Sequence, residues 1–277
     1  MRRLLVMVMA FLAAALMAIG CGGDDEEDAP AGGGDGGAAA VQTVEDGVLT
    51  VGSDIPFPPF EFREGGELTG FDVELVEEMA QRLELRVRWV DTAFDTIFTQ
   101  LAAGRYDVVA SATTITEERR RTVDFTEPYY AAQQTLVVNA EQSPDLRSTD
   151  DLSAGDTVAV QRGTTGETWA QENLPEGVNV RSFPEAPDTY TALEAANVTA
   201  VIFDEPSAVT EAEQREALEV AQTIDTGERY GFAVDPQNDA LLSALNDTLA
   251  EIKEDGTYQR LYDRFEQLPQ GGNILEA

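Results

Sequence analysis

Short apolar segments alternate with amphipathic helical stretches along most of this chain, and this alternation limits the possible folds more than any other feature. Residues Val48 to Gly52 and Leu85 to Val90 read as strands, and the stretch between them, ending at Leu83, carries apolar residues on one helical face. Such alternation is typical of α/β proteins with a largely parallel sheet. A second cycle runs from Asp156 to Asp204. The sequence therefore predicts two similar α/β lobes.

The segment after the strand Tyr106 to Ala110 is the strongest candidate for a binding site. Hydroxyl residues follow the strand, and Thr116 is a good N-cap for a helix beginning at Glu117. Ligands bind at the carboxyl ends of strands in open α/β sheets. Arg119 would lie in the first turn of this helix, where the macrodipole favours anions. Its guanidinium therefore either binds an anion with both nitrogens or belongs to a solvated basic cluster reaching Arg121.

The N-terminal segment predicts export from the cytoplasm. Arg2 and Arg3 precede an apolar run that is short for a membrane span, so residues 1–20 read as a secretory signal peptide. Cys21 is the only cysteine, which excludes an intramolecular disulfide. Its position resembles a bacterial lipobox, in which the cysteine becomes the lipidated first residue; the alternative is a free thiol in an uncleaved signal. Residues 21–43 form a low-complexity linker, expected to be disordered and to tether the folded part to the membrane.

Charge and composition exclude several classes of function. The formal net charge is −34, and phosphate binding needs a cationic surface, so nucleic acid is not an expected partner. The chain has no histidine, which removes Ser-His-Asp triads, Cys-His dyads and histidine-containing metal sites. No metal or cofactor is expected.

Seven short motifs in a fixed order give the chain a specific resemblance. It is similar to the polar amino-acid-binding proteins of bacterial ABC importers, the family 3 solute-binding proteins, over nearly all of Val48 to Phe265. The motifs are Val51-Gly52-Ser53-Asp54 before Pro58-Pro59-Phe60-Glu61-Phe62, Gly70-Phe71-Asp72-Val73, Gly104-Arg105-Tyr106-Asp107, Thr114-Ile115-Thr116-Glu117-Glu118-Arg119, Asp124-Phe125-Thr126-Glu127-Pro128-Tyr129-Tyr130, Gly163-Thr164-Thr165-Gly166 and Asp255-Gly256-Thr257-Tyr258.

The resemblance implies a two-lobed α/β fold of the periplasmic-binding-protein type II, with two hinge crossovers near residues 134–138 and 230–234. Lobe 1 would comprise residues 44–137 and 232–277, and lobe 2 residues 138–231. A single free L-amino acid would bind between the lobes.

The resemblance also implies roles for individual residues. Arg119 would bind the ligand's α-carboxylate with help from the Thr114 hydroxyl, and Asp204 would accept from the α-ammonium group. The alternative for Asp204 is an acidic cap before the next helix. Thr164 and Thr165 would add donors to the carboxylate.

Further residues would surround the ligand's side chain. Phe57 and Phe94 would form aromatic walls, although both could be ordinary core aromatics. Asp54 would accept from the ligand's side chain, Gln161 could donate to it, and Ser111 and Ala112 complete the predicted site. These residues predict a polar or basic L-amino acid, with glutamine, arginine, lysine and histidine not separated.

The implied function is that of an extracytoplasmic, lipid-anchored binding protein that delivers its amino acid to an ABC permease and ATPase. It is expected to be a monomer and not an enzyme. The alternative is a cyclohexadienyl dehydratase-like enzyme on the same scaffold, with Asp54 or Asp204 as the general acid. A surface lipoprotein that has lost its ligand is a third possibility.

Overall fold

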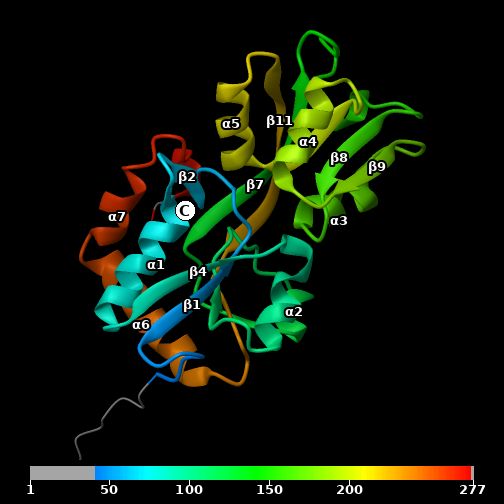
Figure 1. The fold of residues 1–277 in the computed structure, drawn as a ribbon. Coiled ribbons are helices and arrows are strands. Elements are labelled where there is room, and N and C mark those ends of the chain that lie inside the picture. The colour runs from blue at the N-terminus through cyan, green and yellow to red at the C-terminus, as the bar shows by residue number, and fades with distance from the viewer. Residues whose placement is uncertain (1–40, 276–277) are drawn as a thin grey trace, which may run out of the picture. The chain divides into compact units, whose positions relative to one another are not determined.

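Two five-stranded sheets organise the part of the chain that the computed structural model describes, residues 41–275 (Figure 1). The predicted signal peptide, Cys21 and the linker up to residue 40 lie outside the described residues. No helix within residues 41–275 combines the length and the apolar character needed to cross a membrane.

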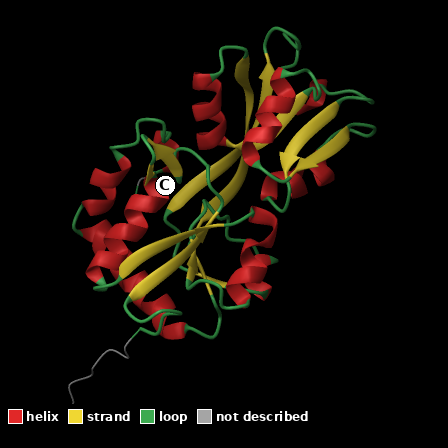
Figure 2. Ribbon diagram, in the orientation of Figure 1, coloured by secondary structure: helices red, strands yellow, loops and turns green. Residues whose placement is uncertain are grey.

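The first sheet has the strand order β4-β1-β5-β12-β6 and is flanked by helices on both faces (Figure 2). Alternation along β5 places Val108 in the cluster that includes α1 and α6, and Val109 in the separate cluster that includes α2. The strands are β1 (Val48–Ser53), β4 (Arg86–Asp91), β5 (Val108–Val109), β6 (Asp124–Phe125) and β12 (Ala233–Val234), with the hairpin β2 (Phe62–Glu64) and β3 (Glu67–Thr69) beside them. The helices are α1 (Phe71–Arg82), η1 (Phe94–Thr96), α2 (Ile97–Ala102), η2 (Arg119–Arg121), α6 (Asp239–Glu254), α7 (Thr257–Tyr262) and η4 (Gln270–Gly272).

The second sheet has the order β11-β7-β10-β8-β9 and is also covered on both faces. Phe203 and Ile202 are neighbours on β10, yet they pack in different clusters, one with α4 and α5 and the other with α3. The strands are β7 (Tyr130–Asn139), β8 (Thr157–Gln161), β9 (Asn179–Phe183), β10 (Ala200–Asp204) and β11 (Leu218–Tyr230). The helices are η3 (Thr149–Asp151), α3 (Thr165–Asn173), α4 (Ala186–Glu194) and α5 (Glu205–Gln214).

Strands β7 and β11 connect the two halves and pair with each other in antiparallel fashion from Leu218↔Asn139 to Tyr230↔Tyr130. The chain passes from β6 into β7, and it returns from β11 into β12 before α6 and α7 complete the first half. This is the two-lobed α/β fold that the sequence predicts, and the fold class is confirmed.

The prediction of a helix beginning at Glu117 is wrong. Thr116 does act as a cap, because its Oγ1 accepts from the Arg119 N–H at 3.1 Å, but only the 3-10 turn η2 follows. The chain leaves this turn because Val123 is buried and β6 begins at Asp124, paired with β12. Tertiary pairing therefore overrides a local signal for a longer helix.

Gly70 fixes the entry into α1 in a conformation that only glycine tolerates. Its φ of 133° and ψ of 168° lie in a region that is closed to residues with a side chain. A Cβ at Gly70 would lie 2.0 Å from the Phe60 carbonyl oxygen, which accepts from the Asp72 N–H at 3.0 Å. This close approach holds the start of α1 against the loop that precedes β2.

We expect Gly70→Ala to lower the free energy of unfolding by about 3–5 kcal/mol, because backbone strain adds to a backbone clash. Gly66→Ala is the matched control: Gly66 also has positive φ, 96°, but no atom lies within 4 Å of its Cβ position. The control should lose about 1–2 kcal/mol. Urea unfolding of both variants measures this difference, and equal losses would show that the clash is unimportant.

Candidate ligand-binding site

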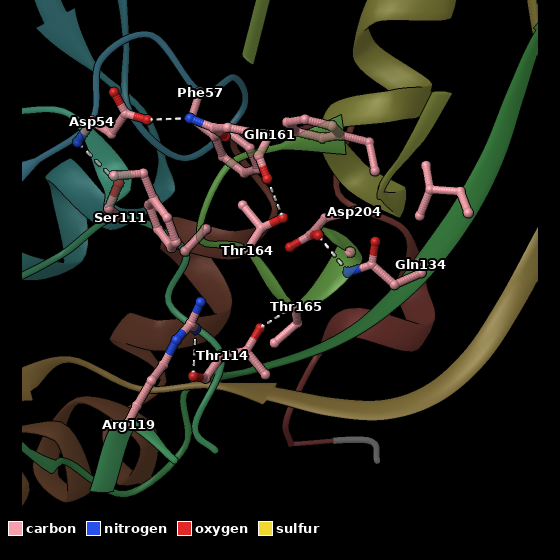
Figure 3. Close-up of a pocket in the computed structure, with 15 residues that line it drawn as sticks. Asp54, Phe57, Ser111, Thr114, Arg119, Gln134, Gln161, Thr164, Thr165 and Asp204 are labelled. Atoms are coloured by element: carbon pink, nitrogen blue, oxygen red, sulfur yellow. Dashed lines mark hydrogen bonds between the residues drawn. The ribbon is translucent and has the colours of Figure 1, made fainter. Parts of the chain in front are cut away.

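One cavity lies where strands and loops of both halves meet, and every residue predicted to bind a ligand lines it (Figure 3). Asp54 follows β1, Ser111 to Thr114 follow β5, and Asp204 ends β10. The predicted residues in the lining are Asp54, Phe57, Phe94, Ser111, Ala112, Thr114, Arg119, Gln161, Thr164, Thr165 and Asp204, joined by Gln134, Gly166, Ile202 and Phe203. The structure thus brings the predicted residues together, and their role in binding stays a prediction.

The cavity is narrow. Its volume, taken as the space that the centre of a water molecule can occupy, is about 20 Å³. That is room for one or two water molecules. An amino acid therefore needs the two halves to move apart before it enters.

Arg119 is a partly buried cation held between the two halves. Its Nη1 donates to the Thr114 carbonyl at 2.7 Å and its Nη2 to the Gly163 carbonyl at 3.2 Å, while its guanidinium carbon lies 5.3 Å from the centre of the Phe94 ring. Within residues 41–275 no carboxylate oxygen lies within 4.0 Å of this guanidinium. Burial lowers the pKa of Arg119 to about 10, opposed by the negative charges of Asp204 and Glu228. Arg119 therefore stays charged at neutral pH.

The solvated basic cluster describes the neighbours of Arg119 but not Arg119 itself. Arg120 and Arg121 are exposed, whereas Arg119 points into the cavity (Figure 3). Arg119 is partly buried, so part of its charge is removed from water without an ion-pair partner, and an anion in the cavity would offset the cost of that desolvation.

Asp204 is a buried carboxylate that lines the cavity and does not cap α5 with its side chain. It occupies the N-cap position of α5 but makes no side-chain cap hydrogen bond. Instead Gln134 Nε2 donates to Asp204 Oδ1 at 2.6 Å, and the Tyr230 hydroxyl donates to Asp204 Oδ2. Burial raises the pKa of Asp204 to about 7, and the charge of Glu228 adds to the rise. The alternative role as a cap is therefore not what the geometry shows.

Asp54 and Gln161 meet at another part of the cavity. Gln161 Nε2 donates to Asp54 Oδ2 at 2.6 Å and to the Pro184 carbonyl at 3.3 Å. Burial raises the pKa of Asp54 to about 7, the hydrogen bond from Gln161 lowers it, and the negative charge of Glu185 raises it further. Arg162, the cationic residue that follows Gln161, does not line this cavity; its Nη1 lies 3.4 Å from Asp95 Oδ2.

Aromatic rings line both sides of the site. Phe57 packs with its ring centre 5.6 Å from that of Phe203, and Phe94 lies 6.0 Å from Phe98. Phe57 and Phe94 are each 8% exposed, so both are buried as core aromatics are while also lining the cavity.

Sequence reasoning missed Gln134, Phe203 and Glu228. Phe203 directly precedes Asp204 on a predicted strand, and Gln134 lies in a predicted crossover, so both positions carried a usable signal. Glu228 touches the site through hydrogen bonds to Thr114 and Thr165, and nothing local in the sequence marks it.

Two buried carboxyl groups support the loop that follows β5. Ala112 has a φ of 45°, which is strained for a residue with a side chain, and its N–H donates to Asp72 Oδ2 at 2.9 Å. Ser111 Oγ donates to Glu61 Oε1 at 2.7 Å and accepts from the Asp54 N–H at 3.0 Å. Burial raises the pKa of Asp72 to about 7 and that of Glu61 well above its usual range, and the charge of Asp72 adds to the rise at Glu61.

Comparison with known proteins places the chain among binding proteins for small solutes. The sequence profile of the "Bacterial extracellular solute-binding proteins, family 3" matches residues 49–267. The L-cystine-binding protein TcyJ of Escherichia coli strain K12 is 32% identical over 223 residues, which is 80% of this chain and 83% of the relative.

Two solved structures resemble the chain closely. A mutant of ArgBP from T. maritima has a TM-score of 0.75 and 36% identity, covering 79% of this chain and 95% of that one. An ancestral amino-acid-binding protein, described as a precursor of cyclohexadienyl dehydratase, has a TM-score of 0.73 and 36% identity over 79% of this chain and 95% of its own.

The buried carboxyl groups predict that stability falls as pH rises from about 5 to 8. Their pKa values are higher in the folded than in the unfolded protein, so the folded state holds more protons in this window and loses that advantage as they dissociate. Glu61→Gln removes one such group and should flatten the profile by up to about 1.4 kcal/mol per pH unit.

Urea unfolding of dialysed protein at several pH values measures this effect. Glu67→Gln, on an exposed position of β3, is the control and should keep the wild-type slope. Parallel profiles for wild type and Glu61→Gln would contradict the assignment of raised pKa values.

Proposed function

Because the chain belongs to the family 3 bacterial extracellular solute-binding proteins, we propose that it captures one polar or basic L-amino acid between its lobes. It is a solute-binding protein and not an enzyme: its relative TcyJ is named as a binding protein, and the ancestral dehydratase precursor is itself described as amino-acid-binding. TcyJ is named as an L-cystine-binding protein and ArgBP from T. maritima has been solved in an arginine-bound form, and both support an amino acid as the solute here.

The observation that carries the proposal is the pairing of one partly buried cation, Arg119, with one buried anion, Asp204, in the same cavity. Arg119 meets an α-carboxylate with a planar fork of donors, which matches two carboxylate oxygens at once. Asp204 meets the α-ammonium group, and the positive charge of that group favours the ionised carboxylate. These two charges match the two ends of a zwitterion.

The lining also favours a polar or basic side chain. Asp54 is a carboxylate acceptor with Gln161 beside it, and the apolar rings of Phe57 and Phe203 cover the ligand's stem. Arg119 is the only cation among the residues that line this cavity. A ligand with a second carboxylate would therefore meet Asp54 without a compensating charge, so glutamate and aspartate are excluded from the proposal.

The protein captures its amino acid outside the cytoplasm and then delivers it to an ABC importer, which consists of a permease and an ATPase. The narrow cavity supports an opening and closing cycle, because an amino acid cannot pass into it otherwise. We further propose that Cys21 carries a lipid and that the linker following it holds the binding domain near the membrane. These last steps rest on the sequence pattern of residues 1–43.

Arg119→Ala should abolish amino-acid binding, because it removes the cation that meets the α-carboxylate. A saturating amino acid at a hundred times its Kd stabilises the folded protein by about 2.7 kcal/mol, which raises Tm by roughly 5–10 °C. A thermal-shift screen of the common L-amino acids measures this rise. Arg120→Ala, the exposed neighbour, is the control and should respond as wild type does. A full response from Arg119→Ala would refute its assignment as the carboxylate-binding residue.

Asp54→Asn should separate basic from neutral ligands. Loss of the carboxylate should weaken arginine and lysine binding by about 10- to 100-fold, whereas glutamine, which needs no counter-charge, should change by less than about threefold. Titration calorimetry with each amino acid measures the effect, and Asp145→Asn, an exposed position in the other half, is the control. Equal losses for all three ligands would show that Asp54 does not contact the side chain.

A further inference from the structure

A single carboxylate oxygen joins the two halves of the molecule beside Arg119. Glu228 Oε2 accepts from Thr114 Oγ1 at 2.6 Å and from Thr165 Oγ1 at 2.8 Å. The two hydroxyl oxygens are 3.5 Å apart, one in the loop after β5 and the other at the start of α3. Glu228 therefore accepts from the hydroxyls of Thr114 and Thr165, two residues that the family resemblance assigns to the α-carboxylate of the amino acid.

Irregular pairing places Glu228 at this point. The register of β11 against β7 shifts between Ile224 and Glu228, and Gly227 adopts a φ of 63°. Such bulges redirect a side chain and are common beside functional sites. Glu228 Oε1 is also held, by Thr226 Oγ1 at 3.0 Å and by Gln134 Nε2 at 3.1 Å.

The same amide links Glu228 to the other end of the site. Gln134 Nε2 donates to Asp204 Oδ1 at 2.6 Å as well as to Glu228 Oε1. The charges of Glu228 and Asp204 each raise the pKa of Arg119, which places both carboxylates within electrostatic range of the guanidinium. Glu228 therefore interacts electrostatically with Arg119, one of the two groups that would bind the zwitterion, and shares the Gln134 amide with Asp204, the other.

Glu228 and an α-carboxylate cannot both use these hydroxyls. Each hydroxyl has one proton and can donate to one acceptor. Two carboxylates at this range also repel each other. A second cavity, of about 510 Å³ and lined by Glu228, Arg119, Thr165 and Trp169, gives the side chain space to swing into. The carboxylate of Glu228 can therefore leave the hydroxyls without unfolding the strand.

We propose that Glu228 is an internal competitor for the α-carboxylate subsite. This inference rests on the proposed function. By occupying the hydroxyls of Thr114 and Thr165, Glu228 weakens binding of the amino acid and speeds its release, and it bridges the two halves when the amino acid has left. The site therefore binds less tightly than its donors alone would allow.

The test compares wild type with Glu228→Gln. The amide keeps the size of the side chain but removes its charge, so its oxygen binds the hydroxyls less strongly and no longer repels an incoming carboxylate. We expect the Kd for the best ligand among L-arginine, L-lysine, L-histidine and L-glutamine to fall about tenfold, with slower dissociation in stopped-flow measurements. Glu219→Gln, on the same strand but paired with Arg147, is the control and should stay within about twofold of wild type.

Each outcome has a distinct meaning. Tighter binding by Glu228→Gln supports the proposal, and equal or weaker binding in the presence of normal wild-type binding overturns it. If wild type binds none of the four amino acids, the proposed function fails first and the inference falls with it. Should Glu228→Gln not fold, Glu228→Asp decides: its shorter side chain cannot reach both hydroxyls, so tighter binding supports the proposal and unchanged binding overturns it.

Discussion

The antiparallel pairing of β7 with β11 is the constraint on which the rest of this structure depends. The two strands are the passages between the halves, so their pairing decides which loops of one sheet face which loops of the other. It brings Thr114 and Arg119 from one half to Thr165 and Asp204 from the other. The strands also contribute polar groups of their own, since Gln134 lies on β7 and Glu228 on β11. The connection is therefore part of the site as well as its frame.

Two carboxyl groups line the cavity and two more lie behind it, in a chain of net charge −34. Burial raises the pKa values of Asp54 and Asp204 in its lining and of Glu61 and Asp72 behind it. These groups favour the folded state most when they are protonated, whereas the proposed ligand needs Asp204 ionised and a basic ligand needs Asp54 ionised as well. Stability of the free protein and affinity for an amino acid should consequently change in opposite directions with pH. A cationic group of the ligand would lower the pKa values of the carboxyl groups in the cavity, because it favours their ionised form, so that they can be charged in the complex.

Much of the fold was predictable because its signals are local. Periodicity and β-branched runs indicated β1, α1 and β8 within one or two residues, and glycines at Gly104 and Gly256 marked the ends of helices. The 3-10 turn at Arg119 was mispredicted because β6 pairs with β12, a contact between segments more than 100 residues apart in the chain. Strand β11 was missed because its residues are mostly partly exposed and polar, so that no apolar alternation marks it. Glu228 was missed with it.

By itself the sequence determined the alternation of strands and helices that is typical of the family and the residue types that suit a zwitterion. It also excluded catalytic and metal sites that need histidine. Those properties depend on residue identity and on short-range pattern, which a single sequence contains in full. Only the tertiary structure decided that Asp54 meets Gln161, that Arg119 lacks a carboxylate within ion-pair distance in residues 41–275, and that Glu228 reaches Thr114 and Thr165. These contacts join residues between 63 and 114 positions apart along the chain, and such residues come close together only once β7 and β11 have brought the two halves together.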